Sequence, residues 1–246
     1  MVQNLFMDKK MLDIINNFDS LGSDFVVGKR NKIKIMPYNN ILLNIKRFKI
    51  PFFLNGIIYN FFRKSKAERS YNYAKILIEK GIGTPNPIGF YEKKTAFRLL
   101  DSYYICEHLS PDYVFKDLFS TPIEDSDIIL KQFAHFTFNL HEEGIEFLDH
   151  SPGNTLIKKI GLDKYAFYLV DLNRMKFHKE MDFKTRMKNL NRITPSEAMT
   201  KTISFEYAKL YGKSEEETFA LMWKYTSEFQ EKSIKKSELK KKIGIK

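Results

Sequence analysis

Residues 145–157 read IEFLDHSPGNTLI and place an acidic and an amide side chain in one short polar loop. Asp149 and Asn154 are five positions apart, and Asn154 comes directly before an apolar run typical of a strand. The segment SPGN between them is good turn chemistry by itself. The same spacing also allows a tight loop to aim both side chains into one site. At this motif alone, both interpretations stay open.

A second acidic motif follows one predicted hairpin later. Residues 168–174 read YLVDLNR, so Asp171 comes directly after an apolar strand. An aspartate there could simply cap the next segment. However, Asp149 and Asp171 lie at matching ends of one predicted hairpin. Phosphoryl transfer needs a carboxylate at the attacking hydroxyl, oxygen ligands for Mg²⁺ and a lysine at the phosphates. The two motifs together therefore favour a kinase-type site.

A candidate lysine lies upstream, where residues 43–46 read LNIK and close the third strand of a predicted meander. Alternation of side chains along a strand puts Asn44 and Lys46 on one face and Ile45 on the other. Lysines are common on solvated strand faces, so Lys46 by itself is weak evidence. Because Lys46 lies on a predicted strand upstream of the Asp149 and Asp171 motifs, it is the candidate for binding nucleotide phosphates.

Periodicity divides the chain into a β-rich half and a mainly helical half. The first half is predicted to begin with a strand meander at 24–27, 32–36 and 41–48, with a turn at Gly28. A helix over 65–80 that ends at Gly81 follows, and then strands near 88–91 and 102–107. The second half is predicted to begin with a helix that ends near Gly144, followed by the polar loop. Strands at 155–158 and 165–170 then form a hairpin with its turn at Gly161, and helices run from 182 to about 231.

This order of elements predicts an α+β fold with two lobes. We expect a nucleotide-binding lobe over residues 1–109, a helical catalytic lobe over 110–231 and a lysine-rich tail over 232–246. Ser110 and Pro111 are the expected connector between the lobes.

The composition and charge of the chain limit the classes of binding partner and the cellular compartment that we expect. The net charge of +11 favours polyanions such as nucleotides, phosphorylated glycolipids or an anionic membrane leaflet. A nucleic-acid partner is not expected, because the chain lacks a recognisable reading motif. The lone Cys106 excludes a disulfide framework and fits the bacterial cytoplasm. The first 18 residues contain acids and indicate neither a signal peptide nor a membrane span, so we expect a soluble protein.

These motifs resemble the lipopolysaccharide kinase family, the Kdo and heptose kinases of the lipopolysaccharide core, a branch of the protein-kinase-like superfamily. The resemblance is carried by NIKRF and RKSKA at 44–48 and 63–67, by LHEEGI at 140–145 with LDHSPGN at 148–154, and by VDLNR at 170–174. It spans roughly residues 20–180. It implies a two-lobed protein-kinase-like fold with a β-rich N-terminal lobe and a mainly helical C-terminal lobe.

The resemblance also implies roles for individual residues. Asp149 would be the catalytic carboxylate, Asn154 and Asp171 the metal ligands, and Lys46 the phosphate-binding lysine. Glu68 would be the helical partner of that lysine. Residues 104–109, which include Glu107, would form the hinge whose backbone meets the adenine. ATP and Mg²⁺ are the implied cofactors.

The chain departs from the protein-kinase pattern at several positions. Phe147 and Leu148 precede the catalytic aspartate, the segment after Asp171 lacks a glycine, and the phosphate loop has the single Gly28. His141, which closes a long helix, is expected to be a hydrogen-bonded structural histidine. For His150 a structural role and a role beside Asp149 or at the substrate both stay open.

We therefore expect an ATP- and Mg²⁺-dependent kinase that phosphorylates a sugar hydroxyl of a lipopolysaccharide-core-like glycolipid. It would be cytoplasmic. For its lysine-rich tail, a solvated chain end and peripheral contact with the anionic inner face of the inner membrane both stay open. Two alternatives stay open. One is a protein or small-molecule phosphotransferase, such as an aminoglycoside-type enzyme, and the other is a catalytically weak kinase-like binding protein.

Overall fold

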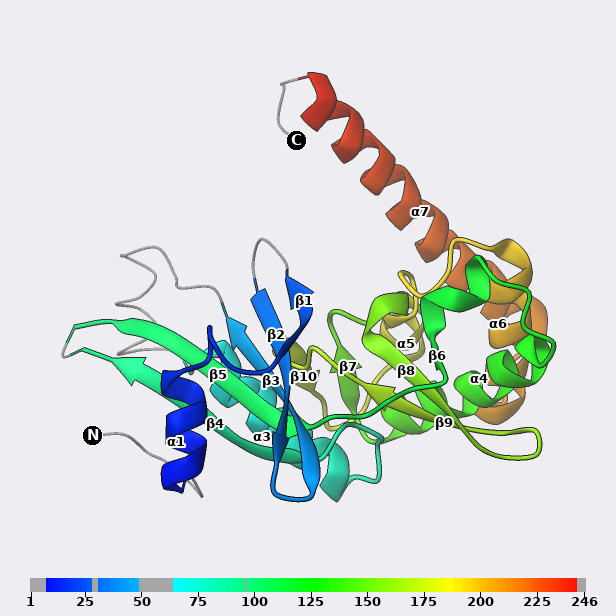
Figure 1. The fold of residues 1–246 in the computed structure, drawn as a ribbon. Helices are drawn as coiled ribbons and strands as arrows, with labels where there is room; N and C mark the ends of the chain where they lie inside the picture. The colour runs from blue at the N-terminus through cyan, green and yellow to red at the C-terminus, as the bar shows by residue number, and fades with distance from the viewer. Residues whose placement is uncertain (1–7, 28–30, 49–63, 96, 243–246) are drawn as a thin grey trace. The chain divides into compact units, whose positions relative to one another are not determined.

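The computed structural model describes residues 8–27, 31–48, 64–95 and 97–242 (Figure 1). The chain forms two compact units: the first is Met1–Ser110 with Asp171–Arg174, and the second is Pro111–Val170 with Met175–Lys246. The predicted turn at Gly28 and the Arg63 of the resemblance lie outside the described residues. An antiparallel sheet dominates the first unit and helices dominate the second, which confirms the expected α+β fold with a β-rich N-terminal part and a mainly helical C-terminal part.

The first unit is built on a five-stranded antiparallel sheet in the order β1-β2-β3-β5-β4. Its strands are β1 (Ser23–Val27), β2 (Asn31–Tyr38), β3 (Ile41–Phe48), β4 (Pro87–Lys94) and β5 (Leu99–Glu107), and its helices are α1 (Lys9–Asn16) and α3 (Lys66–Glu79). The predicted meander is confirmed, because β2 pairs with β3 in unbroken register.

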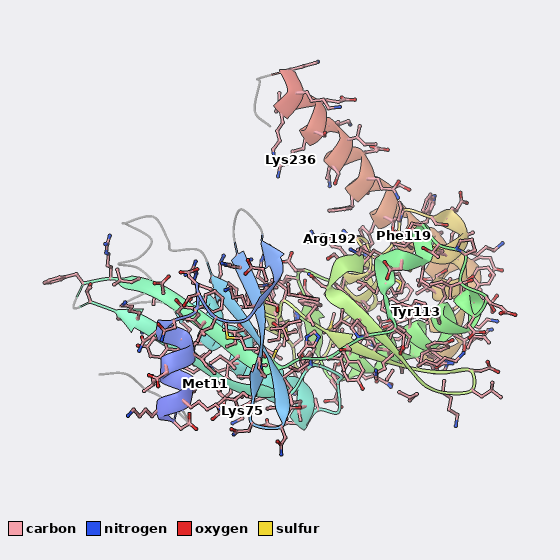
Figure 2. The ribbon with its side chains drawn as sticks, viewed as in Figure 1. Met11, Lys75, Tyr113, Phe119, Arg192 and Lys236 are labelled. Carbon is pink, nitrogen blue, oxygen red and sulfur yellow. The ribbon has the colours of Figure 1, made fainter. Side chains whose placement is uncertain are left out.

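Side chains alternate along β3 as the pattern predicts. Leu43 and Ile45 are fully buried and share one apolar cluster with Met11 of α1. Figure 2 labels Met11 on that helix. Lys46 lies on the opposite face of the strand. The apolar face thus anchors β3 in the core, while the other face is left for a charged side chain.

Helix α3 begins and ends at the residues that the sequence indicates. The Ser65 hydroxyl accepts the N–H of Glu68 at 3.0 Å and caps the first turn. Gly81 adopts a left-handed φ of +71°. The N–H of Ile82 then donates to the carbonyl of Leu77 at 2.8 Å, which is the Schellman ending that a glycine permits.

The second unit packs helices against two small antiparallel sheets, β6-β8-β9 and β10-β7. Its strands are β6 (Tyr113–Val114), β7 (Ile145–Phe147), β8 (Thr155–Gly161), β9 (Lys164–Leu169) and β10 (Met175–Phe177). Its helices are α4 (Ser126–Glu142), α5 (Phe183–Asn189), α6 (Glu197–Tyr211) and α7 (Glu215–Lys242), with 3-10 turns η1 (Phe115–Phe119) and η2 (Pro152–Asn154). Ile129 and Phe133 on α4 are fully buried in the core, as their spacing predicts.

Two local predictions are wrong in detail. The β8–β9 hairpin turns at residues 162–163, and Asp163 rather than Gly161 takes the left-handed conformation, with a φ of +51°. Aspartate tolerates this region because its short polar side chain can bond locally. Helix α7 continues to Lys242 instead of ending near residue 231. Lysine is a good helix former, and lysines in the last turn complement the helix dipole.

Candidate active site

Lys46 and Asp171 form an ion pair within the first unit. The Lys46 ammonium lies 2.7 Å from Oδ1 of Asp171. The lysine side chain is only 11% exposed, whereas the Asp171 side chain is 32% exposed, so the carboxylate is partly accessible to solvent. Asn173 donates from its amide to the same Oδ1 at 2.6 Å. Two donors therefore hold the carboxylate that the sequence assigns to the metal.

Asp171 also adopts an unusual backbone conformation. Its φ is +59°, one of three positive values among the described non-glycine residues. Such a conformation costs roughly 1–3 kcal/mol in a non-glycine residue and persists where surrounding contacts over-determine it. The amide of Asn173 is one such contact. The sequence interpretation missed Asn173, although its position two residues after Asp171 was the available signal.

The loop that joins β7 to β8 in the second unit carries Asp149 and Asn154 and closes on itself. The amide of Asn154 donates to the backbone carbonyl of Asp149 at 2.9 Å. The N–H of Val170 donates to the carbonyl of Asn154 at 3.0 Å, which ties the loop to the end of β9. The five-residue spacing of Asp149 and Asn154 is thus what lets the side chain of one reach the backbone of the other.

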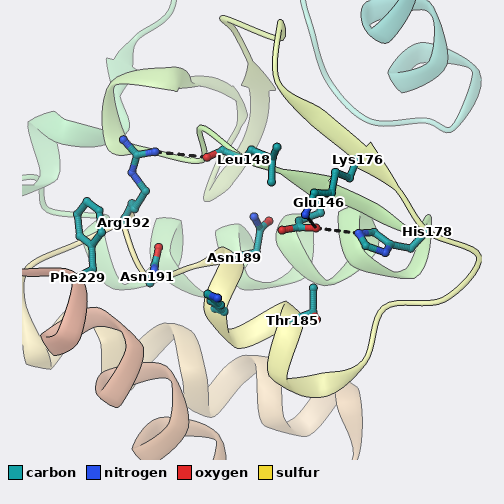
Figure 3. A pocket seen from close by; sticks show the side chains of 10 residues that line it. Glu146, Leu148, Lys176, His178, Thr185, Asn189, Asn191, Arg192 and Phe229 are labelled. Atoms are coloured by element: carbon teal, nitrogen blue, oxygen red, sulfur yellow. Dashed lines mark hydrogen bonds and ion pairs between the residues drawn. The ribbon is translucent and has the colours of Figure 1, made fainter. Parts of the chain in front are cut away.

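Arg192 binds the predicted catalytic carboxylate. Its Nη1 lies 2.9 Å from Oδ1 of Asp149 and donates to the carbonyl of Leu148 at 3.3 Å (Figure 3). The guanidinium lies over the ring of Phe229, 5.3 Å from its centroid. Arg192 therefore orients Asp149 from one side. No local motif marks it in the sequence, because it follows Asp149 by 43 residues.

His141 is a structural histidine, as predicted. Its ring lies in hydrogen-bond distance of the Tyr207 hydroxyl at 2.9 Å and of Oδ1 of Asn189 at 3.2 Å. The Asn189 amide donates to the carbonyl of Phe147 at 2.8 Å. Burial lowers the pKa of His141 to about 3, so the ring is neutral. This network fixes the strand that leads into Asp149.

The structure favours a structural role for His150 as well. Its ring is 1% exposed and lies between the rings of Phe133 and Phe147. Neither ring nitrogen has a hydrogen-bond partner among the described residues. Burial lowers the pKa of His150 to about 3. A buried, neutral ring of this kind does not present a polar atom to a substrate.

The two remaining predicted site residues have other partners in this structure. The Glu68 carboxylate pairs with Lys64 at 3.3 Å, whereas Lys46 pairs with Asp171. The Glu107 backbone N–H donates to the carbonyl of Asn86 at 2.9 Å, and its carboxylate accepts the Asn86 amide at 3.1 Å. Among the described residues, the structure therefore joins Lys46 with Asp171 and Asn154 with Asp149, but it does not join Glu68 with Lys46.

A cavity of about 400 Å³ lies within the second unit, beside the loop between β7 and β8 (Figure 3). Leu148 and Arg192 line it next to Asp149. Lys176 of β10, Lys188 of α5 and Phe229 of α7 also line it. No local motif in the sequence marks these three residues.

An antiparallel sheet carrying a buried lysine, followed by a helical unit with an Asp–Asn loop, defines a phosphotransferase of the protein-kinase-like class. The sequence profile of the Lipopolysaccharide kinase (Kdo/WaaP) family matches residues 52–211, well over half of the chain. The chain therefore belongs to this family and is a kinase whose family acts on sugar hydroxyls.

A solved structure titled "WaaP in complex with acyl carrier protein" has a similar fold. The alignment has a TM-score of 0.59 and 14% identity, and it covers 88% of this chain and 92% of the other. At this identity the likeness shows the fold alone. No curated protein matches the chain.

The matched range differs from the roughly 20–180 that the motifs indicated. It includes Asp149, Asn154 and Asp171 but begins after Lys46. The assignment of Lys46 therefore rests on its ion pair with Asp171 rather than on the family match.

Proposed function

We propose that the chain is an ATP- and Mg²⁺-dependent kinase that phosphorylates a sugar hydroxyl of a lipopolysaccharide-core-like glycolipid. The observation that carries this proposal is the 2.7 Å ion pair between Lys46 and Asp171. It brings a lysine of β3 together with the acid that follows β9, and these are the residue types that phosphoryl transfer uses at the nucleotide phosphates and at the metal. A solvated lysine or a helix-capping aspartate would not need this contact.

The oxygen donors of the chain fit Mg²⁺. Asn154 uses its amide nitrogen on the backbone of Asp149, so its Oδ1 is the atom suited to a metal. Asp171 supplies a carboxylate. Mg²⁺ is commonly held by one or two carboxylates together with substrate phosphates. The described residues accordingly contain no cluster of three or more His, Cys, Asp or Glu that could hold a metal alone. When bound, Mg²⁺ would neutralise charge on the phosphates.

The other residues have distinct proposed roles. Asp149 orients the acceptor hydroxyl and receives its proton, while Arg192 fixes that carboxylate through the 2.9 Å contact. Lys46 moves from Asp171 to the nucleotide phosphates. Glu68 is the candidate second carboxylate for Lys46 once this exchange occurs. The backbone of residues 104–109, with Glu107, contacts the adenine.

We further propose a cytoplasmic location with peripheral contact at the inner face of the inner membrane. Residues 231–242 of α7 are exposed, and residues 232–242 contain six lysines (Figure 2 labels Lys236). Ile234 and Leu239 are 58% and 60% exposed in the same segment. Each basic residue near an anionic leaflet contributes about 1 kcal/mol. No helix of the described chain combines the length and apolarity needed to cross a bilayer.

An ATP-consumption assay with product mass measurement tests the proposed activity. Kdo-lipid A, an aminoglycoside and a protein substrate are compared as acceptors. We expect Mg²⁺-dependent turnover and a phosphorylated product with the glycolipid. Phosphorylation of the aminoglycoside or the protein alone would support the alternative phosphotransferases. No ATP consumption with any acceptor would support a kinase-like binding protein.

A further inference from the structure

The two donors that hold Asp171 both bind the same carboxylate oxygen. The Lys46 ammonium lies 2.7 Å from Oδ1, and the Asn173 amide donates to Oδ1 at 2.6 Å. No residue that the structure describes makes a hydrogen bond or ion pair with Oδ2. Oδ2 is not among the buried polar atoms without a partner, so it is open to solvent. The carboxylate is therefore held at one oxygen and accessible at the other.

Asn173 is fixed in place by burial. It is 8% exposed, and the neighbouring Leu172 is 2% exposed. From this position the amide reaches back over two residues to the carboxylate, next to the left-handed φ of +59° at Asp171. A buried side chain has little rotamer freedom left to lose, so this donor is pre-organised for the carboxylate.

The two donors differ in what nucleotide binding does to them. Lys46 is the proposed ligand of the phosphates and leaves the carboxylate when it binds them. The neutral amide of Asn173 has no such competing partner, so it stays on Oδ1. In the protein-kinase pattern Asp-Phe-Gly, the position two residues after the aspartate is a glycine, which has no side chain to donate. Asn173 thus supplies a contact that this pattern lacks.

We infer that Asn173 is a positioning residue of the metal site: it holds Oδ1 of Asp171 and so keeps Oδ2 as the oxygen available to Mg²⁺. The inference rests on the proposed function and adds to it a residue that acts through Asp171. Hydrogen-bond partners of a metal-binding carboxylate fix its orientation, and their mutation typically weakens metal affinity or activity about 10–100-fold.

Calorimetric titration of ATP, with Mg²⁺ present and with the metal chelated, tests this role without measuring turnover. Asn173→Leu removes the donor at nearly constant size. It should weaken ATP binding about 10–100-fold in Mg²⁺ and leave ATP binding in the chelator at the parental value. Asn173→His keeps an N–H donor and should restore part of the affinity. Melting temperatures show whether each variant folds, and Asn173→Ala takes the place of a leucine variant that does not.

The same titration in an Asp171→Asn background shows whether Asn173 acts through the carboxylate. There, Asn173→Leu should cause no further loss, because its charged partner is already gone. Two outcomes would overturn the inference: Asn173→Leu binds Mg-ATP like the parent, or it causes the same loss in both backgrounds. Either outcome, with Mg-ATP binding weakened by Asp171→Asn alone, would leave the proposed function standing. A parent protein that does not bind Mg-ATP would contradict the proposed function and this inference with it.

Discussion

The Lys46 ammonium and the Asp171 carboxylate are 2.7 Å apart, and the aspartate holds this position with a left-handed backbone. The carboxylate assigned to the metal is therefore occupied by the cation assigned to the nucleotide phosphates. Binding of Mg-ATP would exchange these partners, so that the lysine meets phosphate and the aspartate meets metal. Asn173, which also donates to the carboxylate, needs no such exchange.

Arg192→Gln should lower turnover about tenfold and leave Mg-ATP affinity unchanged. The substitution removes the charged contact that orients Asp149, but it leaves Lys46 and Asp171 intact. Steady-state kinetics together with ATP titration measure both quantities. Arg192→Lys should restore part of the turnover, because it keeps the positive charge without the planar geometry. A parallel loss of ATP affinity and melting temperature in both variants would mean that Arg192 only stabilises the fold.

Gly144→Ala should destabilise the protein more than Gly212→Ala. Both glycines have left-handed φ values, +71° and +74°, so an alanine costs about 1–2 kcal/mol at either. A Cβ at Gly144 would also collide with the carbonyl oxygen of His178, whereas the space around Gly212 is open. Urea denaturation of both variants measures the difference. Equal losses of unfolding free energy would contradict the close approach at Gly144.

His150→Leu should reduce the acid sensitivity of the fold. In the folded protein, burial lowers the pKa of His150 to about 3, so the ring is neutral above that pH. In the unfolded chain the ring ionises near pH 6.5. Between these values the unfolded state binds more protons, so the unfolding free energy falls as pH decreases. The slope is up to about 1.4 kcal/mol per pH unit for each such histidine.

His141 contributes a second slope of the same sign, so the leucine variant should retain part of the dependence. Denaturant titrations at several pH values from 7 to 4 compare the variant with the parent. At pH 7 the variant should be at least as stable, because leucine removes two buried ring nitrogens without partners. Identical slopes in both proteins would contradict the burial of a neutral His150.

Deletion of residues 232–246 should weaken binding to anionic vesicles and leave binding to neutral vesicles unchanged. The deleted segment contains seven lysines, and its part within α7 is exposed. Vesicle co-sedimentation measures the effect, and turnover of a soluble acceptor should barely change. Equal binding of both proteins to anionic vesicles would show that the lysines only solvate the chain end.

Local patterns were sufficient to predict much of the fold and part of the site. Alternation along residues 43–46 predicted that Ile45 and Lys46 face opposite sides, and their contacts agree: Ile45 lies in the apolar cluster with Leu43, whereas Lys46 pairs with Asp171. The position of Asp171 after an apolar strand placed it at the end of β9. These relationships depend on spacing over a few residues, which the sequence displays directly.

Contacts over longer distances could not be predicted in this way. Arg192 reaches Asp149 from 43 residues away, and Asn189 reaches Phe147 from 42. The strands β7 and β10 pair over three residues each, which is too short for a periodic pattern. The predicted partner Glu68 has the right chain position but pairs with Lys64. Which acid meets a lysine depends on packing that spacing does not reveal.

In the proposed site, Asp149 acts on the acceptor hydroxyl while Asp171 holds the metal. Asp149→Asn and Asp171→Asn are near-isosteric changes of half-buried groups, so both proteins should fold. ATP affinity and turnover of each variant across a Mg²⁺ titration form the most direct test. Asp149→Asn should keep Mg-ATP affinity and lose turnover about 10²–10⁴-fold, as expected for loss of a general base. Asp171→Asn should lose both, with partial recovery at high Mg²⁺. Parental affinity and turnover in both variants would show that neither acid takes part in catalysis.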